Sequence, residues 1–236
     1  MADDLADDDE DAEISSKKLD DWGKMLSASL QGDYQHPVFI ALAETIRTFS
    51  IPVALFQNLL KAFRQDQKVK QYKTYSDLLG YCQNSANPVG RIYLYLFRLQ
   101  DEPRFERADA VCTALQLSNF WQDVKRDRQK NRVYIPMEDM KRFHCSEKDF
   151  KKETATENFR KLIKFEVDRT QELLNFGKEL LELVPAQPRF EIKLFIGGGE
   201  AVLDSIRKLD YDTLSKRPVV SKWRKAKIML HSWKKN

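Results

Sequence analysis

Hydrophobic side chains recur at the helical period along most of this chain. Residues 155–183 are the clearest example and are expected to form one long amphipathic helix, because their apolar positions recur near the helical period. These positions are Phe159, Leu162, Ile163, Val167, Leu173, Leu174, Leu180 and Leu181. The sequence shows neither the alternation typical of half-buried strands nor an Asn-Gly hairpin turn. The pattern therefore predicts an all-α protein.

Prolines divide this pattern into separate helices. A first-turn proline is compatible with a helix, so Pro37 predicts a helix to about Phe49, Pro52 predicts one reaching towards Gln71, and Pro103 opens a long helix. The other expected boundaries are Asn87-Pro88, a surface connection over 136–152, a break at 185–188, and a final helix after Pro218. Residues 190–212 are expected to form one or two helices, broken or kinked at Gly197-Gly198-Gly199.

Composition is ordinary for a soluble globular protein, with 42% hydrophobic and 32% charged residues in 236. No internal repeat or polar linker divides the chain, so residues 1–236 are expected to form a single domain. The three cysteines and three histidines lack the spacing of a disulfide framework, a zinc site or a nucleophile–His pair, which favours a reducing cytosol. The sequence contains no signal peptide and no apolar run long enough to span a membrane.

Charge is distributed unevenly, although the net charge is only +4. Residues 216–236 combine many Lys and Arg residues with Trp223, Met229, Leu230 and Trp233. Such a segment either lies on an anionic membrane surface or forms a basic terminal helix packed on the domain, and the packed helix is the preferred interpretation. Binding to nucleic acid is not expected, because no nucleic-acid motif accompanies the charge.

The candidate chemistry lies on the long helix that follows Pro103. Asp123 and Asp127 are four residues apart, so their carboxylates lie on one face, and Gln116 and Asn119 lie on the same stripe. The opposite face is apolar, with Leu115, Phe120, Trp121 and Val124. Because Mg²⁺ prefers oxygen ligands and shares them with substrate phosphates, the stripe predicts one wall of a site for a metal-bound diphosphate. A solvated helix with a chance Asp pair is the alternative.

A second acidic cluster stands at the start of the chain. Residues 3–13 contain eight acidic residues and no basic one, so a facing metal-binding cluster and a simple acidic tail are both open. The three consecutive glycines lack the strand and the Lys-Ser/Thr of a phosphate loop. They are expected to allow close helix packing or to leave room for a bulky ligand.

Several of these segments resemble a known family, the squalene and phytoene synthases. The stretch Gln116-x-x-Asn119-x-x-x-Asp123-x-x-x-Asp127, continuing to Asn131-Arg132-Val133-Tyr134-Ile135-Pro136, resembles their second aspartate-rich signature. Asp3-Asp4-Leu5-Ala6-Asp7 resembles the end of the first signature. The segment Tyr81–Arg91 is similar to that of one bacterial branch, the HpnC-type squalene synthase (hydroxysqualene synthase). Tyr211-Asp212-x-Leu214-x-x-Arg217-Pro218 also fits, so the resemblance covers essentially the whole chain.

The resemblance implies an isoprenoid-synthase helical bundle around a central cavity, with Mg²⁺ as cofactor. Carried over by position, the implied metal ligands are Asp3, Asp7, Asn119, Asp123 and Asp127. Asp123 and Asp127 are also implied to be catalytic, together with Tyr81 near the reacting centre, whereas the implied substrate-binding residues are Gln116, Asn119, Arg132, Tyr134 and Arg217. The family normally has one or two further helices before the first aspartate motif, so the domain is expected to be N-terminally incomplete.

The implied reaction is the Mg²⁺-dependent ionisation of presqualene diphosphate to hydroxysqualene in squalene and hopanoid biosynthesis. One alternative is a head-to-head prenyltransferase, making presqualene diphosphate or squalene from farnesyl diphosphate, or making phytoene. Another is an inactive truncated homologue that acts as a pathway partner. The chain lacks a nicotinamide-binding signature, so the implied pathway partners are a presqualene diphosphate synthase and a separate reductase. The expected location is cytoplasmic, with peripheral contact at the inner face of the membrane.

Overall fold

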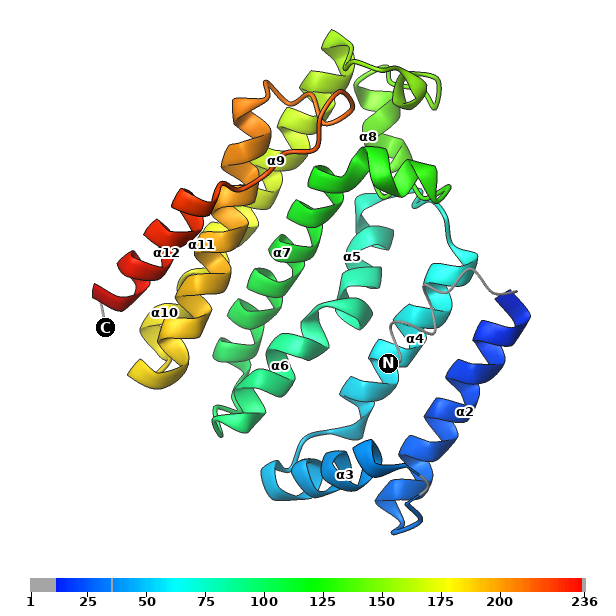
Figure 1. Ribbon diagram of the computed structural model, residues 1–236, viewed down its shortest axis with the longest axis vertical. Helices are drawn as coiled ribbons and strands as arrows, with labels where there is room; N and C mark the ends of the chain where they lie inside the picture. The colour runs from blue at the N-terminus through cyan, green and yellow to red at the C-terminus, as the bar shows by residue number, and fades with distance from the viewer. Residues whose placement is uncertain (1–11, 35, 235–236) are drawn as a thin grey trace.

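The computed structural model describes residues 12–34 and 36–234, and helices form nearly all of its regular structure (Figure 1). The elements are α2 (Ala12–Leu30), α3 (Pro37–Phe49), α4 (Val53–Lys68), α5 (Tyr75–Ser85), α6 (Asn87–Leu96), α7 (Glu102–Gln129), α8 (Met137–Arg142), the 3₁₀ helix η1 (Asp149–Lys151), α9 (Glu157–Gly177), α10 (Leu180–Leu183), α11 (Ala186–Lys208) and α12 (Lys222–Lys234). No strand occurs in this part of the chain, where the β-type pairing is an isolated bridge between Gln71 and Val133. The all-α prediction is confirmed.

Helix α7 runs through the middle of the bundle and packs against α5, α6, α9, α10 and α11 (Figure 1). It can occupy this position because apolar residues cover most of its circumference, and Leu117 and Trp121 are fully buried. The Trp121 indole donates a hydrogen bond of 2.8 Å to the Thr170 hydroxyl of α9. A buried indole N–H needs such a partner, so this contact fixes how α7 and α9 pack.

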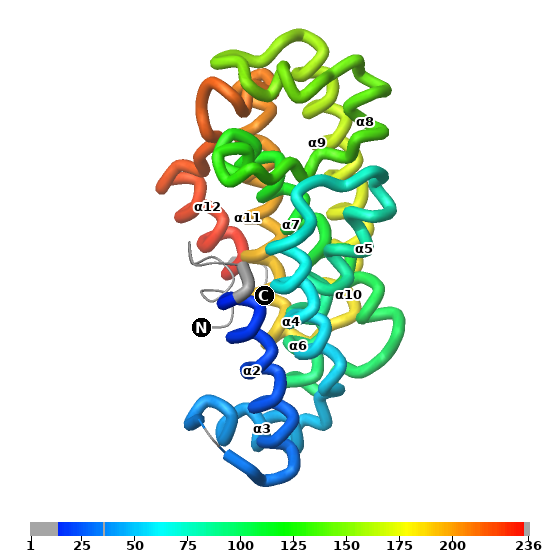
Figure 2. The backbone as a smooth tube through the Cα atoms, turned by 90° about the vertical axis from the view of Figure 1, so that its right-hand side faces the viewer, coloured from blue at the N-terminus to red at the C-terminus, as the bar shows by residue number. Residues whose placement is uncertain are grey.

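A second, smaller apolar cluster joins α2, α3 and α4. Trp22 packs on Phe39 with 4.8 Å between ring centroids, and Leu19 and Ile46 are buried beside them. Helix α3 lies at the opposite end of the molecule from α8 in both views (Figures 1 and 2). The aspartate-bearing end of α7, which leads into α8, is therefore far from α3.

The proline-based helix starts are confirmed, but two predicted boundaries are wrong. The long helix expected over 155–183 is two helices, because the chain turns at Lys178 and Glu179 between α9 and α10. The chain does not break at the three glycines, since α11 continues through them without interruption.

Close packing explains why those glycines remain helical. A Cβ atom on Gly197 would lie 2.8 Å from Ile228 Cγ2 of α12, and one on Gly199 would lie 2.8 Å from Leu115 Cδ2 of α7. Real Cβ atoms do not approach other atoms so closely, so only glycine lets both helices pack at this distance on α11. The expectation of close helix packing is confirmed at these two positions.

Candidate active site

Asp123 and Asp127 lie one turn apart near the C-terminal end of α7, on a face that is only partly covered. Phe120, Trp121 and Val124 on the other side are buried in the main core. The core contacts fix the rotation of the helix, so both carboxylates are held at the edge of the bundle. The predicted two-faced character of this helix is confirmed.

Arg217 binds the Asp123 carboxylate with two hydrogen bonds. Its Nε lies 2.6 Å from Oδ1 and its Nη2 lies 2.8 Å from Oδ2, which is the bidentate geometry of a strong arginine–carboxylate pair. The same Nη2 donates to the Gln122 side-chain oxygen at 3.2 Å, and the Gln122 amide donates to the Pro218 carbonyl at 2.7 Å. Pairing with Asp123 raises the pKa of Arg217 above its ordinary value. The sequence motif that contains Arg217 is thereby brought to the aspartate helix.

The loop that carries Arg217 is organised by Asp212. This buried carboxylate accepts hydrogen bonds from the backbone N–H groups of Ala155 (3.1 Å), Leu214 (3.3 Å) and Ser215 (3.0 Å). Arg160 adds an ion pair at 3.0 Å. Burial alone would raise the pKa of Asp212, but these bonds outweigh it and hold the pKa below its ordinary value. Asp212 is therefore a positioning residue for Arg217.

Asp127 differs from Asp123, because its carboxylate forms no hydrogen bond or ion pair with any of the described residues. Burial raises its pKa to about 7, and the neighbouring charge of Asp123 adds to the rise. Arg132 opposes this shift from the turn after α7, where its backbone N–H donates to the Asp127 carbonyl at 2.8 Å. A bound cation stabilises a carboxylate in this environment more strongly than it stabilises a solvated one.

Aromatic side chains form the wall beside these acids. Phe120 and Tyr134 stack with 3.8 Å between centroids and 6° between ring planes, and Tyr81 and Tyr72 complete the group. Burial raises the pKa of Tyr81 well above its usual range. The Tyr81 hydroxyl donates a 2.9 Å hydrogen bond to Asp66 of α4. Tyr81 is therefore a neutral donor held in place, close to Tyr134 and to α7.

Gln116 and Asn119 continue the polar stripe towards the start of α7. Gln116 is half-buried, whereas Asn119 is exposed. An apolar cavity of about 200 Å³ lies further along the same helix, between α6, α7 and α11. Its lining includes Gly90, Ala108, Val111, Leu115 and Phe195.

The described oxygen donors fit a hard divalent cation, although they make up only part of a site. Asp127 offers a carboxylate without a hydrogen-bond partner among the described residues, Asp123 lies one turn away, and Asn119 is exposed to solvent. No group of three or more His, Cys, Asp or Glu side chains in the described ranges is arranged to hold a metal. Asp3 and Asp7, the other predicted ligands, lie outside those ranges. The predicted metal ligands therefore remain a proposal.

Comparison with known proteins defines the family. The family described as "Squalene/phytoene synthase" matches residues 1–224. The chain belongs to this family. A crystal structure of squalene synthase HpnC from Alicyclobacillus acidocaldarius is 38% identical, with a TM-score of 0.84 over 89% of this chain and 80% of that one. The isoprenoid-synthase bundle inferred from the sequence is thereby confirmed.

Two further relatives extend the comparison. A crystal structure of a dehydrosqualene synthase is 26% identical, with a TM-score of 0.88 over 99% of this chain and 82% of that one. A 15-cis-phytoene synthase from Synechocystis sp. is 26% identical over 98% of this chain and 72% of its own length. These family members differ in their named products, so the HpnC-type branch remains a prediction.

The sequence did not indicate Asp66 or Gln122 as residues of the site, and it did not indicate the role of Asp212. Asp66 sits in a polar run of α4, and nothing in its spacing marks it as the partner of Tyr81. Gln122 lies next to Asp123 but off the acidic stripe. Asp212 was noted as part of a motif, but its role in holding the loop depends on contacts with Ala155 and Arg160 that are distant in sequence.

Proposed function

We propose that this protein ionises presqualene diphosphate in an Mg²⁺-dependent reaction and yields hydroxysqualene. The observation that carries the proposal is the arrangement of Asp123 and Asp127 beside Arg217 and Arg132, on a helix that also borders an apolar cavity. The higher identity to squalene synthase HpnC, 38% against 26% for a dehydrosqualene synthase and a phytoene synthase, supports this reaction within the family.

The polar end of the site binds the diphosphate in this proposal. Arg217 and Arg132 hold its oxygens, as guanidinium groups do in many phosphate sites. Asp123, Asp127 and Asn119 hold Mg²⁺ together with Asp3 and Asp7. Bound Mg²⁺ neutralises the charge that develops on the leaving group. Tyr134 lies two residues after Arg132 and lines the same end.

The apolar cavity between α6, α7 and α11, the apolar end of the site, binds the hydrocarbon part of the substrate in this proposal. The carbon–oxygen bond to the diphosphate breaks, and the diphosphate leaves with the bonding electron pair. Water then adds to the cation and loses a proton, giving hydroxysqualene and diphosphate. Phe120, Tyr134 and Tyr81 form an aromatic wall that excludes bulk water and faces positive charge favourably. Gln116 lines the boundary between the polar and apolar ends.

A head-to-head prenyltransferase is the second candidate, because relatives that match nearly the whole chain are named phytoene synthases. Such an enzyme consumes farnesyl or geranylgeranyl diphosphate and makes presqualene diphosphate, squalene or phytoene. An inactive homologue that assists a presqualene diphosphate synthase and a reductase is the third. The three differ in substrate, so one experiment separates them.

The test is incubation of this chain with Mg²⁺ and each diphosphate in turn, followed by mass spectrometry of the extracted products. Hydroxysqualene from presqualene diphosphate is the expected result. A product from farnesyl or geranylgeranyl diphosphate instead would establish the transferase, and no product from any substrate would favour the pathway partner. Asp123→Asn and Asp127→Asn should each abolish turnover without changing helical circular dichroism. Asp168→Asn, at an exposed acid of α9, is the matched control and should retain activity.

A further inference from the structure

Helix α12 is attached to the bundle by one face only. Ile228 packs closely against Gly197 of α11, and Ser232 is buried one turn later. In Figure 1, α12 lies at the outer edge of the molecule beside α11. The packed-helix interpretation is thus correct for this inner face.

The outer face of α12 carries large apolar side chains in solvent. Trp223 is 88% exposed and Trp233 is 74% exposed, and Met229 and Leu230 between them are each more than half exposed. Positions 223, 230 and 233 are seven and three residues apart, and position 229 is four residues before 233, so the four side chains share one face of the helix. We call Trp223, Met229, Leu230 and Trp233 the outer stripe. Isolated exposed apolar residues are common, but a stripe with two exposed tryptophans indicates a surface that is covered by something.

Positive charge surrounds the outer stripe. The sequence from residue 213 to the end contains eight Lys or Arg residues and no Asp or Glu. Lys222, Lys225 and Lys227 are exposed, and none of them pairs with an acidic side chain in the part of the chain that the structure describes. Exposed cations that lack acidic partners favour an anionic surface as the occupant.

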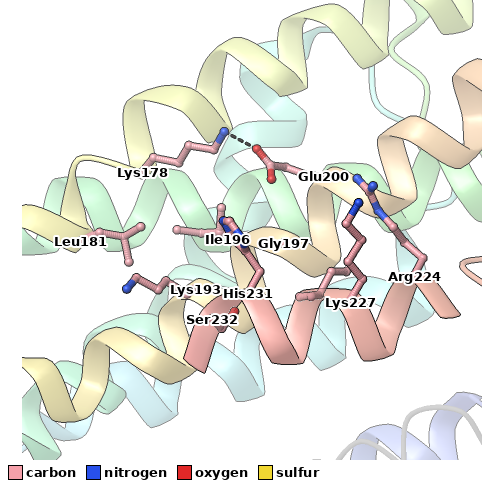
Figure 3. A pocket seen from close by; sticks show the side chains of 11 residues that line it. Lys178, Leu181, Lys193, Ile196, Gly197, Glu200, Arg224, Lys227, His231 and Ser232 are labelled. Carbon is pink, nitrogen blue, oxygen red and sulfur yellow. Dashed lines mark ion pairs between the residues drawn. The ribbon is translucent and has the colours of Figure 1, made fainter. Parts of the chain in front are cut away.

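A hollow of about 390 Å³ lies between α11 and α12 (Figure 3) and is lined from α12 by its inner face, including Ile228 and Ser232. Arg224 and Lys227 project into it from α12, and Lys193 lines it from α11. Its acidic side chain, Glu200, is paired with Lys178. Arg224 is also paired with Asp204 of α11 at 2.9 Å, so among the described residues Lys227 is the α12 lysine of the hollow that adds to the uncompensated positive charge.

We infer that α12 docks this protein onto an anionic lipid bilayer, with the outer stripe in the interface and the lysines against lipid phosphates. Tryptophan is the side chain most suited to the boundary between lipid and water, and a helix with apolar and basic residues lies in that plane. A second copy of this chain is a poorer occupant, since two stripes face to face would bring two sets of cations together. None of the described helices is long and apolar enough to cross a membrane, so the contact is peripheral.

Vesicle co-sedimentation tests this inference without reference to the reaction. The wild-type chain should bind phosphatidylcholine vesicles containing about one-third phosphatidylglycerol about tenfold more tightly than pure phosphatidylcholine. The double variant Trp223→Ser/Trp233→Ser should bind the anionic vesicles about tenfold more weakly. The triple variant Lys222→Gln/Lys225→Gln/Lys227→Gln should bind the anionic vesicles about tenfold more weakly, which removes the lipid preference.

Ile40→Ser is the matched control, because Ile40 is 52% exposed and lies on α3, a helix away from α12 (Figure 1). It should leave vesicle binding unchanged, and circular dichroism should confirm that every variant is folded. Equal binding to neutral and anionic vesicles would overturn the inference, as would binding that survives the tryptophan substitutions. Concentration-dependent dimerisation that those substitutions remove, without vesicle binding, would assign the stripe to a second copy instead.

Discussion

Arg217 and Asp123 form a bidentate ion pair across 94 positions of sequence, with Nε–Oδ1 at 2.6 Å and Nη2–Oδ2 at 2.8 Å. The pair joins the loop before α12 to the aspartate helix and places a fixed cation at the edge of the candidate site. Lysine carries the same charge but cannot reproduce the two parallel hydrogen bonds.

Substitution of Arg217 by Lys should therefore impair activity far more than stability. We expect kcat/KM to fall about a hundredfold, because lysine cannot make the two parallel hydrogen bonds that position the Asp123 carboxylate, and a charge-assisted hydrogen bond contributes roughly 1.5–3 kcal/mol. The free energy of unfolding should change by less than about 1 kcal/mol, since both side chains are partly exposed. Steady-state kinetics and urea unfolding measure the two quantities. An active Lys variant would show that the guanidinium geometry is not used.

The Tyr81–Asp66 hydrogen bond should contribute measurably to stability. Tyr81→Phe removes the partly buried hydrogen bond from the Tyr81 hydroxyl to Asp66, and we expect the free energy of unfolding to fall by about 1–3 kcal/mol. The control is Tyr93→Phe, which removes a hydroxyl bonded at 2.8 Å to an exposed carboxylate, that of Glu191. Tyr93→Phe should lower the free energy of unfolding by less than about 1 kcal/mol. Equal losses in the free energy of unfolding for Tyr81→Phe and Tyr93→Phe would contradict the description of Tyr81 as buried and held in place by Asp66.

Glu166 should make stability fall as pH rises. Its carboxyl is fully buried and shares Arg169 with Asp139, and burial raises its pKa from 4.5 to about 8. Between these two values the folded chain holds a proton that the unfolded chain has released. The stabilisation from this group is therefore complete below pH 4.5 and is lost as pH approaches about 8, by on the order of 1 kcal/mol or more.

Urea unfolding at several pH values checks this dependence. The Glu166→Gln variant cannot titrate at this position, so its free energy of unfolding should vary less between about pH 5 and about pH 8. Parallel pH profiles for wild type and variant would show that Glu166 is ionised throughout that range.

Two glycines offer a test of the packing around α7. A Cβ on Gly177 would lie 2.7 Å from Val111 Cγ2 and 2.8 Å from the Val111 backbone nitrogen, so Gly177→Ala should destabilise the protein by about 1–3 kcal/mol. A Cβ on Gly198 meets nothing within 4 Å, and Gly198→Ala within α11 should stabilise it by up to about 1 kcal/mol. Thermal and urea unfolding measure both changes. Effects of the same sign would contradict this description of the helix contacts.

Local signals made the helices predictable. Pro37, Pro88 and Pro103 stand in the first turns of α3, α6 and α7, where a missing N–H costs nothing. The glycines of α11 misled the sequence analysis, because their low helix propensity is overridden by contacts with Ile228 and Leu115 that no local pattern reveals.

The candidate site likewise contains residues that local sequence patterns predict and residues that they do not. The Asp123–Asp127 stripe follows from helical spacing, so it was visible in the sequence. The exposure of Asn119, the Asp66 partner of Tyr81 and the Asp212-centred loop each depend on residues brought together by the fold. Long-range side-chain contacts of this kind leave no periodic signal in a single sequence.

The central claim is that the carboxylates of α7 and the adjacent arginines bind a metal-complexed diphosphate. Isothermal titration of this chain with inorganic pyrophosphate, with and without Mg²⁺, measures it most directly. We predict that binding requires Mg²⁺ and is lost in Asp123→Asn and Asp127→Asn but kept in the surface variant Asp168→Asn. Binding that is equally strong without Mg²⁺, or that survives both substitutions on α7, would contradict the claim.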